Sequence, residues 1–181
     1  MKSHFNRSSA SKETINKLIK SLSSKDPAER HRAQIRLSEI GKPAVAALIK
    51  LTAGLEPELR HDAASILGDI RAPSAIPALI NLLDDQAFEV RWRAAESLIH
   101  MKREGVVPLF RELQRAKRFD SVWFLDGVRH ILRKLDEEGY LGPPAQKVLE
   151  AFEDSMREIA IPKAAEKALE SLKKPRSQPL P

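Results

Sequence analysis

Hydrophobic positions recur along this chain at intervals of 30 or 31 residues. Arg30, Arg60 and Arg91 mark the interval, and each is followed by alanine three residues later and by leucine seven residues later. Isoleucine or methionine follows ten residues after each arginine. A fourth unit keeps the apolar register, with Val122 at the position of the arginine. Agreement of several positions over four units indicates a repeat architecture.

Each unit predicts two amphipathic helices. In the first helix the apolar residues fall at i, i+3, i+4 and i+7, as at 76, 79, 80 and 83. In the second helix the apolar positions again share one helical face. Proline and glycine separate the helices, and no strand pattern is present. Helical pairs that each need a neighbour to cover an apolar face predict an all-α fold, a right-handed α-solenoid.

The period predicts the organisation of the chain. We expect one domain over residues 12–172, with flexible segments at 1–11 and 173–181, whose composition is low in apolar residues. The helical pairs are expected at about 13–40, 43–70, 73–101 and 104–135. Beyond residue 135 the period ends, and 144–172 predicts one helix over 144–160 and a short last helix that begins at Pro162.

The segments DPAERHRAQIRLSEIG, EPELRHDAASILGDI and AFEVRWRAAESLIHM resemble the second helices of HEAT repeats, and their short period is similar to the phycobilisome-lyase-type HEAT-like repeats. The resemblance covers about residues 13–135. It implies that the second helices line a concave face and that an Asp–Arg ladder joins the repeats. The ladder arginines would be Arg30, Arg60 and Arg91, with Asp26 and Glu56 in the loops before them. Pairing through Asp85, which lies two residues farther from its arginine, is left open.

One column of the second helices should face solvent. The residue after each arginine position lies well away from the apolar face at 100° per residue, and it is occupied in turn by His31, His61, Trp92 and Trp123. Neighbouring outward positions add Arg32, Arg93, Phe124 and Ile99. Aromatic and apolar side chains rimmed by charge are typical of recognition surfaces. The predicted partner-binding residues are therefore Trp92, Trp123, His31, His61, Arg32, Arg93 and Ile99.

Two alternatives stay open for this column. The tryptophans could fill the seams between adjacent repeats, and the histidines could be solvated without a ligand.

Nucleic acid is the second class of partner, because the chain carries a net charge of +6. Four basic residues gather near the end of the fourth unit's first helix, namely Arg111, Arg115, Lys117 and Arg118. Convergence of these residues would form a phosphate clamp, whereas a solvated helix face is the simpler explanation.

Catalysis and cofactors are not expected. The chain has no cysteine, its histidines lack a metal-binding i, i+4 spacing, and it has no phosphate-binding glycine loop. Some HEAT-like proteins are DNA glycosylases, and here Trp92 with Glu96, or Trp123 with Asp126, could imitate their aromatic–carboxylate pair. Related repeats also act as bilin lyases. We expect neither activity, no metal and no cofactor.

The most favoured function is therefore a non-catalytic scaffold or adaptor that binds a protein or peptide along its concave face. The start of the chain has no apolar stretch typical of a signal peptide, and no apolar run reaches the roughly 18–20 residues of a membrane span. A cytoplasmic location without membrane contact is expected.

Overall fold

The computed structural model describes residues 11–173, except the side chains of Ala116, Lys117 and Lys173. Within these residues the regular structure consists of ten α-helices and four short 3-10 helices. The predicted all-α solenoid class is confirmed. The chain forms two compact units, an N-terminal unit that ends at Met101 and a C-terminal unit that begins at Lys102. The prediction of one domain over 12–172 stays a prediction.

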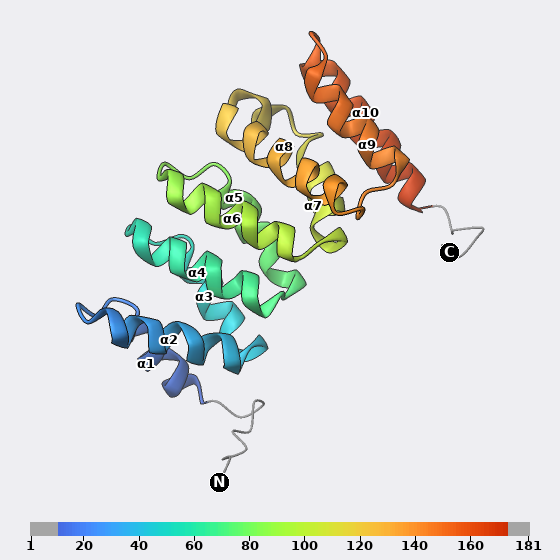
Figure 1. Cartoon of the computed structure of the whole chain (residues 1–181). Coiled ribbons are helices and arrows are strands. Elements are labelled where there is room, and N and C mark those ends of the chain that lie inside the picture. The colour runs from blue at the N-terminus through green and yellow to red at the C-terminus, as the bar shows by residue number, and fades with distance from the viewer. Residues whose placement is uncertain (1–10, 174–181) are drawn as a thin grey trace. The chain divides into compact units, whose positions relative to one another are not determined.

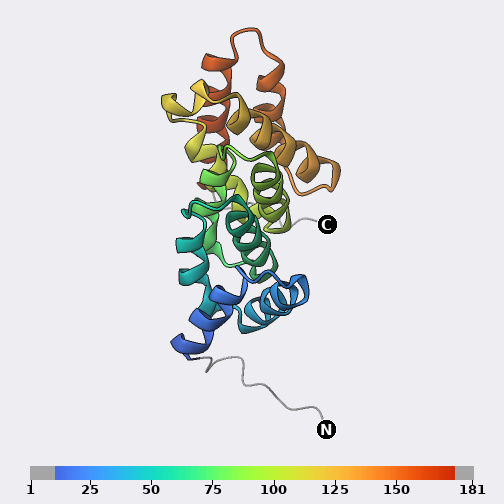
Figure 2. The same ribbon diagram turned by 90° about the vertical axis from the view of Figure 1, so that its left-hand side faces the viewer.

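The N-terminal unit consists of three helical pairs in two layers (Figures 1 and 2). One layer holds α1 (Lys12–Ser21), α3 (Val45–Leu51) and α5 (Ile76–Leu82). The other holds α2 (Pro27–Ile40), α4 (Pro57–Ile70) and α6 (Phe88–His100). Each helix of the first layer packs on the helix that follows it, and α4 packs on both α2 and α6. The 3-10 helices η1 (Lys42–Ala44) and η2 (Pro73–Ala75) lead into α3 and α5.

The repeated apolar residues form the core of this unit. The alanine and leucine columns are buried in all three repeats, with Leu37, Leu67 and Leu98 fully inaccessible. Because these residues share one face of each second helix, they cover the first helix of the same pair. Proline at the first position of α2 and α4 starts these helices where a missing N–H costs least. Apolar periodicity and helix-start signals thus account for the three helical pairs of this unit.

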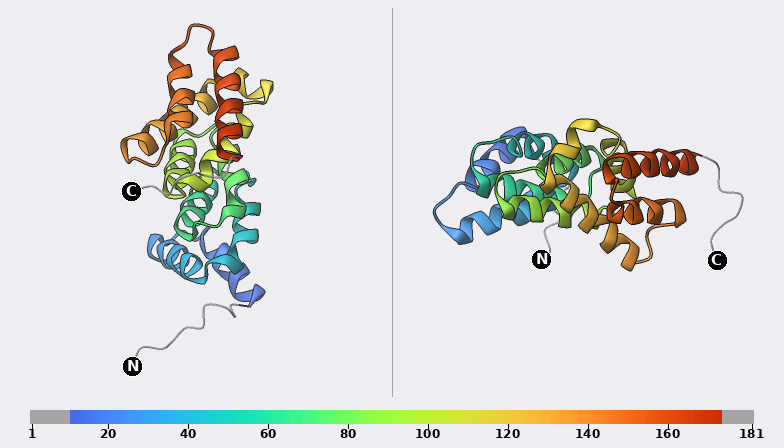
Figure 3. Two further views of the ribbon diagram at one scale, coloured as in Figure 1. Left: turned by 90° about the vertical axis from the view of Figure 1, so that its right-hand side faces the viewer. Right: turned by 90° about the horizontal axis from the view of Figure 1, so that it is seen from above.

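The C-terminal unit has a less regular order of helices (Figure 3). It contains α7 (Arg103–Glu112), η3 (Ala116–Asp120), α8 (Val122–Glu137), α9 (Pro143–Glu150), η4 (Ala151–Glu153) and α10 (Arg157–Lys173). α10 packs against α7 and α9, and α9 also contacts α8.

The helix predicted over 144–160 is interrupted, and the prediction of a helix start at Pro162 is wrong. Asp154 has an extended backbone, and its carboxylate accepts a hydrogen bond of 2.7 Å from the Met156 N–H. This contact ends η4 and leads into α10, which contains Pro162 near its beginning. A proline there removes only one backbone hydrogen bond, while Ile161 and Ala165 bury the inner face of the helix.

The predicted flexible ends fall almost wholly outside the described residues. Ser11 is described and caps α1, because its hydroxyl accepts a hydrogen bond from the Thr14 N–H. At the other end, α10 continues to Lys173.

Candidate partner-binding surface

The repeated arginines hold the loop that precedes their own helix. Nη1 of Arg30 donates to the carbonyl oxygens of Ser24 and Lys25, at 2.8 and 3.3 Å. The same atom of Arg60 and of Arg91 makes the equivalent pair of contacts in the next two repeats. The charged guanidinium thus donates to carbonyl oxygens of the loop, which accept no hydrogen bond within a helix. Each loop, and the helical turn after it, is therefore fixed in the same way.

One arginine also joins two repeats. Nε and Nη2 of Arg60 each donate to a carboxylate oxygen of Asp85 at 2.7 Å, and both side chains are nearly buried. Asp85 also accepts the Ala87 N–H at 2.9 Å. This is the inter-repeat ladder that the resemblance implied, but it uses Asp85. The other two acids expected in the ladder, Asp26 and Glu56, precede α2 and α4. Asp26 caps α2 by accepting a hydrogen bond from the Ala28 N–H, whereas Glu56 makes no capping hydrogen bond.

The ladder pair shifts the pKa of both partners. Burial alone would raise the pKa of Asp85, but hydrogen bonds from Arg60 and from the Ala87 N–H outweigh it, so this pKa lies below its usual value. The hydrogen bonds that Arg60 donates to Asp85 raise the pKa of Arg60. The ion pair therefore belongs to the folded state and joins the second and third repeats.

The structure places most of the predicted column at the surface. Trp92 and Trp123 are 47% and 49% exposed, so neither is enclosed in a seam. His31 and Arg32 are exposed as well. Exposure of these side chains was the premise of the predicted binding surface, and their contact with a partner stays a prediction.

His61 and Arg93 are half-buried and bind each other between α4 and α6. Arg93 Nε–H donates to His61 Nε2 at 3.3 Å. The proton of the neutral imidazole must then lie on Nδ1, which faces the Asp62 carboxylate at 3.3 Å. A polar chain from α6 to α4 thus fixes the ring of His61.

The expectation that Ile99 faces solvent is wrong, because only 7% of it is exposed. The same position in α4 holds Gly68, which is buried against α6: a Cβ there would lie 2.7 Å from the Ser97 Cβ. Within the N-terminal unit, α4 packs beside α2 and α6 as well as against α3, so its buried arc is wider than the sequence pattern indicates.

Phe124 is also buried, although the column placed it at the surface. Its ring lies 4.9 Å from the Arg118 guanidinium, which belongs to η3. The 3-10 helix η3 packs against α8 and was not predicted from the sequence. Asp126, by contrast, is exposed.

An aromatic pair on α6 was missed. Phe88 is 62% exposed, and its ring stacks on that of Trp92 with centroids 6.4 Å apart. The Arg91 guanidinium lies 5.7 Å from the centre of the Phe88 ring. The i, i+4 spacing of Phe88 and Trp92 was the available signal, since residues at that spacing are neighbours on a helix.

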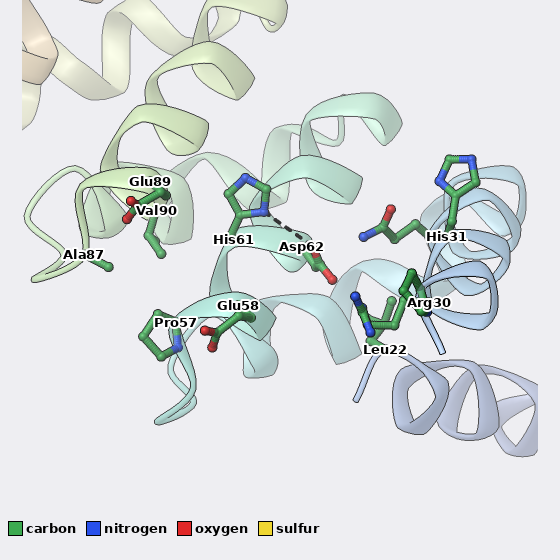
Figure 4. A pocket seen from close by; sticks show the side chains of 12 residues that line it. Leu22, Arg30, His31, Pro57, Glu58, His61, Asp62, Ala87, Glu89 and Val90 are labelled. Carbon is green, nitrogen blue, oxygen red and sulfur yellow. Dashed lines mark hydrogen bonds and ion pairs between the residues drawn. The ribbon is translucent and has the colours of Figure 1, made fainter. Parts of the chain in front are cut away.

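A pocket of about 470 Å³ opens between α2, α4 and α6 (Figure 4). We call it the three-helix pocket. His31 and Gln34 of α2, His61 and Asp62 of α4, and Glu89 of α6 line it together with Glu58. Pro57 and Ala87 supply apolar surface beside them, and Leu22 and Val90 are buried behind it. Two of the predicted binding residues, His31 and His61, thus share one concavity.

The basic cluster of the C-terminal unit is partly paired. Glu112 accepts from Arg115 at 3.0 Å and from Arg118 at 3.3 Å. Arg111 is exposed, while the side chain of Lys117 lies outside the described residues. Glu112 therefore reduces the charge available to phosphate groups.

Neither metal ligands nor a membrane span are found in the described part of the chain. Residues 11–173 contain no group of three His, Asp or Glu side chains placed to hold a metal ion. None of their helices is both long and apolar enough to cross a bilayer.

Comparison with known proteins identifies the repeats. A family model described as HEAT repeats matches residues 45–122, which confirms the resemblance over that part of the chain. None of the curated proteins matches this chain.

Designed proteins are among the similar solved structures. Two engineered proteins are each 22% identical over 89% of this chain, covering 80% and 48% of their own chains, with TM-scores of 0.40 and 0.39. A designed armadillo repeat protein is 17% identical over 87% of this chain and 99% of its own, with a TM-score of 0.37. Likeness at this level carries no argument about function.

Proposed function

Starting from HEAT repeats over residues 45–122, we propose that this protein is a non-catalytic scaffold that binds a protein or peptide through the outer side chains of its second helices. The repeat fold is one commonly used for protein binding. The observation that carries the proposal is the half-exposure of Trp92 and Trp123, which occupy the same repeat position.

Half-exposed tryptophans suit this function. A partner that covers them removes a large apolar surface from water, and few side-chain rotations are lost in the process. Phe88 extends the apolar area around Trp92. Tryptophan and arginine are the residues most enriched among those that dominate binding energy. Trp92 and Trp123 are thus the expected anchors.

The polar residues around the anchors would set the orientation of the partner. Arg32 is exposed, and its contact with Asp26 is long, at 3.7 Å. Such an exposed pair is worth little and can be exchanged for a contact with a ligand. His31 also presents its ring to the surface, whereas His61 and Arg93 are held by each other.

The test is an affinity purification with the full chain as bait. The variant carries Trp92→Ala and Trp123→Ala. The matched control carries Met156→Ala and Ile159→Ala, which remove two other exposed apolar side chains, at 62% and 61% exposure. Circular dichroism first establishes that all three proteins are folded. We expect a protein partner that is retained by wild type and control but lost with the tryptophan variant.

Two results contradict the proposal. Equal recovery of the partner with the tryptophan variant would place the binding site elsewhere. Recovery of nuclease-sensitive material alone would favour the nucleic-acid alternative and the cluster at Arg111, Arg115 and Arg118. Nucleic-acid binding would also weaken steeply with added salt, because phosphate contacts release counterions.

A further inference from the structure

The three-helix pocket has the dimensions of a side-chain receptor. Its volume of about 470 Å³ falls within the range of roughly 300–1,000 Å³ that is typical of ligand sites. Pro57 and Ala87 supply accessible apolar surface to it, whereas Leu22 and Val90 belong to its lining but are buried. Such walls can hold the methylene stem of a long side chain while polar groups bind its end.

The pocket also carries unbalanced negative charge. Glu58 and Glu89 line it from the same position of successive repeats, two residues before Arg60 and Arg91. Neither carboxylate accepts a hydrogen bond from a residue in the range 11–173. Arg30, the one arginine or lysine among the lining residues, donates to the carbonyl oxygens of Ser24 and Lys25.

Helix position accounts for only part of this arrangement. Glu58 and Glu89 lie in the first turns of α4 and α6, where the helix dipole favours a carboxylate. That effect explains an acidic residue in a first turn. It does not explain why both carboxylates border one cavity that has apolar walls and two imidazoles.

We infer that the three-helix pocket receives a cationic side chain, arginine or lysine, of a partner peptide. The inference rests on the proposed function and names the chemistry of its partner. The cationic group binds Glu58 and Glu89, and the stem of the side chain lies over Pro57 and Ala87. Arginine fits best, because its planar guanidinium makes two parallel hydrogen bonds to a carboxylate.

The experiment is a selection of phage-displayed random dodecapeptides on the full chain, followed by fluorescence anisotropy with labelled copies of the enriched peptides. The pocket variant is Glu58→Gln with Glu89→Gln. The charge-matched control is Glu13→Gln with Glu39→Gln, which removes two exposed carboxylates of the same unit outside the pocket. Each peptide is also made with citrulline in place of arginine, which keeps the shape and removes the charge.

We expect the enriched peptides to contain arginine or lysine. Their affinity should fall about tenfold or more with the pocket variant and with citrulline, and stay unchanged with the control, as befits charge-assisted hydrogen bonds.

The inference is overturned if the enriched peptides lack basic residues. It is also overturned if they bind the pocket variant with the same affinity as wild type. If those same peptides lose affinity when Trp92 is changed to alanine, the proposed function still stands. If no peptide is enriched over a blank support, both proposals fail.

Discussion

Replacing Asp85 with asparagine should destabilise the N-terminal unit by about 2–4 kcal/mol. Breaking a buried ion pair by removing one partner costs roughly 3–5 kcal/mol. The side chains of Arg60 and Asp85 are 13% and 7% exposed, so this range applies. Two contacts reduce the loss: Arg60 keeps its carbonyl acceptors at Gly54 and Leu55, and an asparagine can still accept the Ala87 N–H.

The assay is urea unfolding followed by tryptophan fluorescence. A Trp123→Phe background leaves Trp92 as the reporter of the N-terminal unit, since the chain has two tryptophans. Arg60→Met and the double variant complete a cycle that isolates the interaction between the two side chains. The control, Glu39→Gln, breaks the exposed Arg36–Glu39 pair and should change stability by less than about 0.5 kcal/mol.

The effect should also depend on pH. The pKa of Asp85 lies below its usual value in the folded state, because hydrogen bonds from Arg60 and Ala87 outweigh burial. The stability this carboxylate contributes is therefore complete above its unfolded pKa of about 3.9 and is lost as the pH falls through the lower folded value. The difference in the free energy of unfolding between wild type and Asp85→Asn should be largest at neutral pH and should decrease below about pH 4. A coupling energy below about 0.5 kcal/mol in the cycle at neutral pH would refute the reasoning.

The remaining predictions concern packing and backbone conformation, and urea unfolding measures each of them. Gly68→Ala should lower the free energy of unfolding by about 1–3 kcal/mol, because the new Cβ would lie 2.5 Å from the Ser97 hydroxyl. A variant more stable than wild type would show that α4 and α6 can separate to admit the methyl group. Lys102→Gly should exceed Lys102→Ala in stability by about 1–2 kcal/mol, since Lys102 has a φ of 54° and a ψ of −132°, close to those of Gly41; equal stability would contradict backbone strain. Leu98→Ala should cost about 2–5 kcal/mol, as it empties a fully buried position, and a loss below about 1 kcal/mol would argue against that packing.

The helical pairs and the core could be predicted from the sequence. A period of 3.6 residues decides which side chains share a helix face, so the leucines at 37, 67 and 98 had to be buried together. The same angular argument placed Trp92 and Trp123 away from that face, and the structure leaves both half-exposed. Family resemblance supplied the idea of an inter-repeat ladder, and the arginine of its observed pair, Arg60, was named correctly.

Contacts between neighbouring repeats could not be predicted in this way. Gly68 points outward from its own pair, yet it is buried because α4 also packs beside α6, and Ile99, at the same repeat position, is 7% exposed. The acid that pairs with Arg60 is Asp85, whose pairing the sequence left open, and it comes from the loop of the next repeat, 25 residues along the chain. The three-helix pocket combines residues from three helices that no local pattern connects.

By itself, then, the sequence determined the helices, their paired order and the faces that each pair buries, because these follow from local periodicity. Tertiary structure decided which outward residues stay exposed and which charges form buried ion pairs. Trp92 and Glu58 are accessible, whereas Ile99 is covered and Asp85 is paired. These outcomes depend on the distance between adjacent helices, and that distance is set by the packing of side chains far apart in the chain.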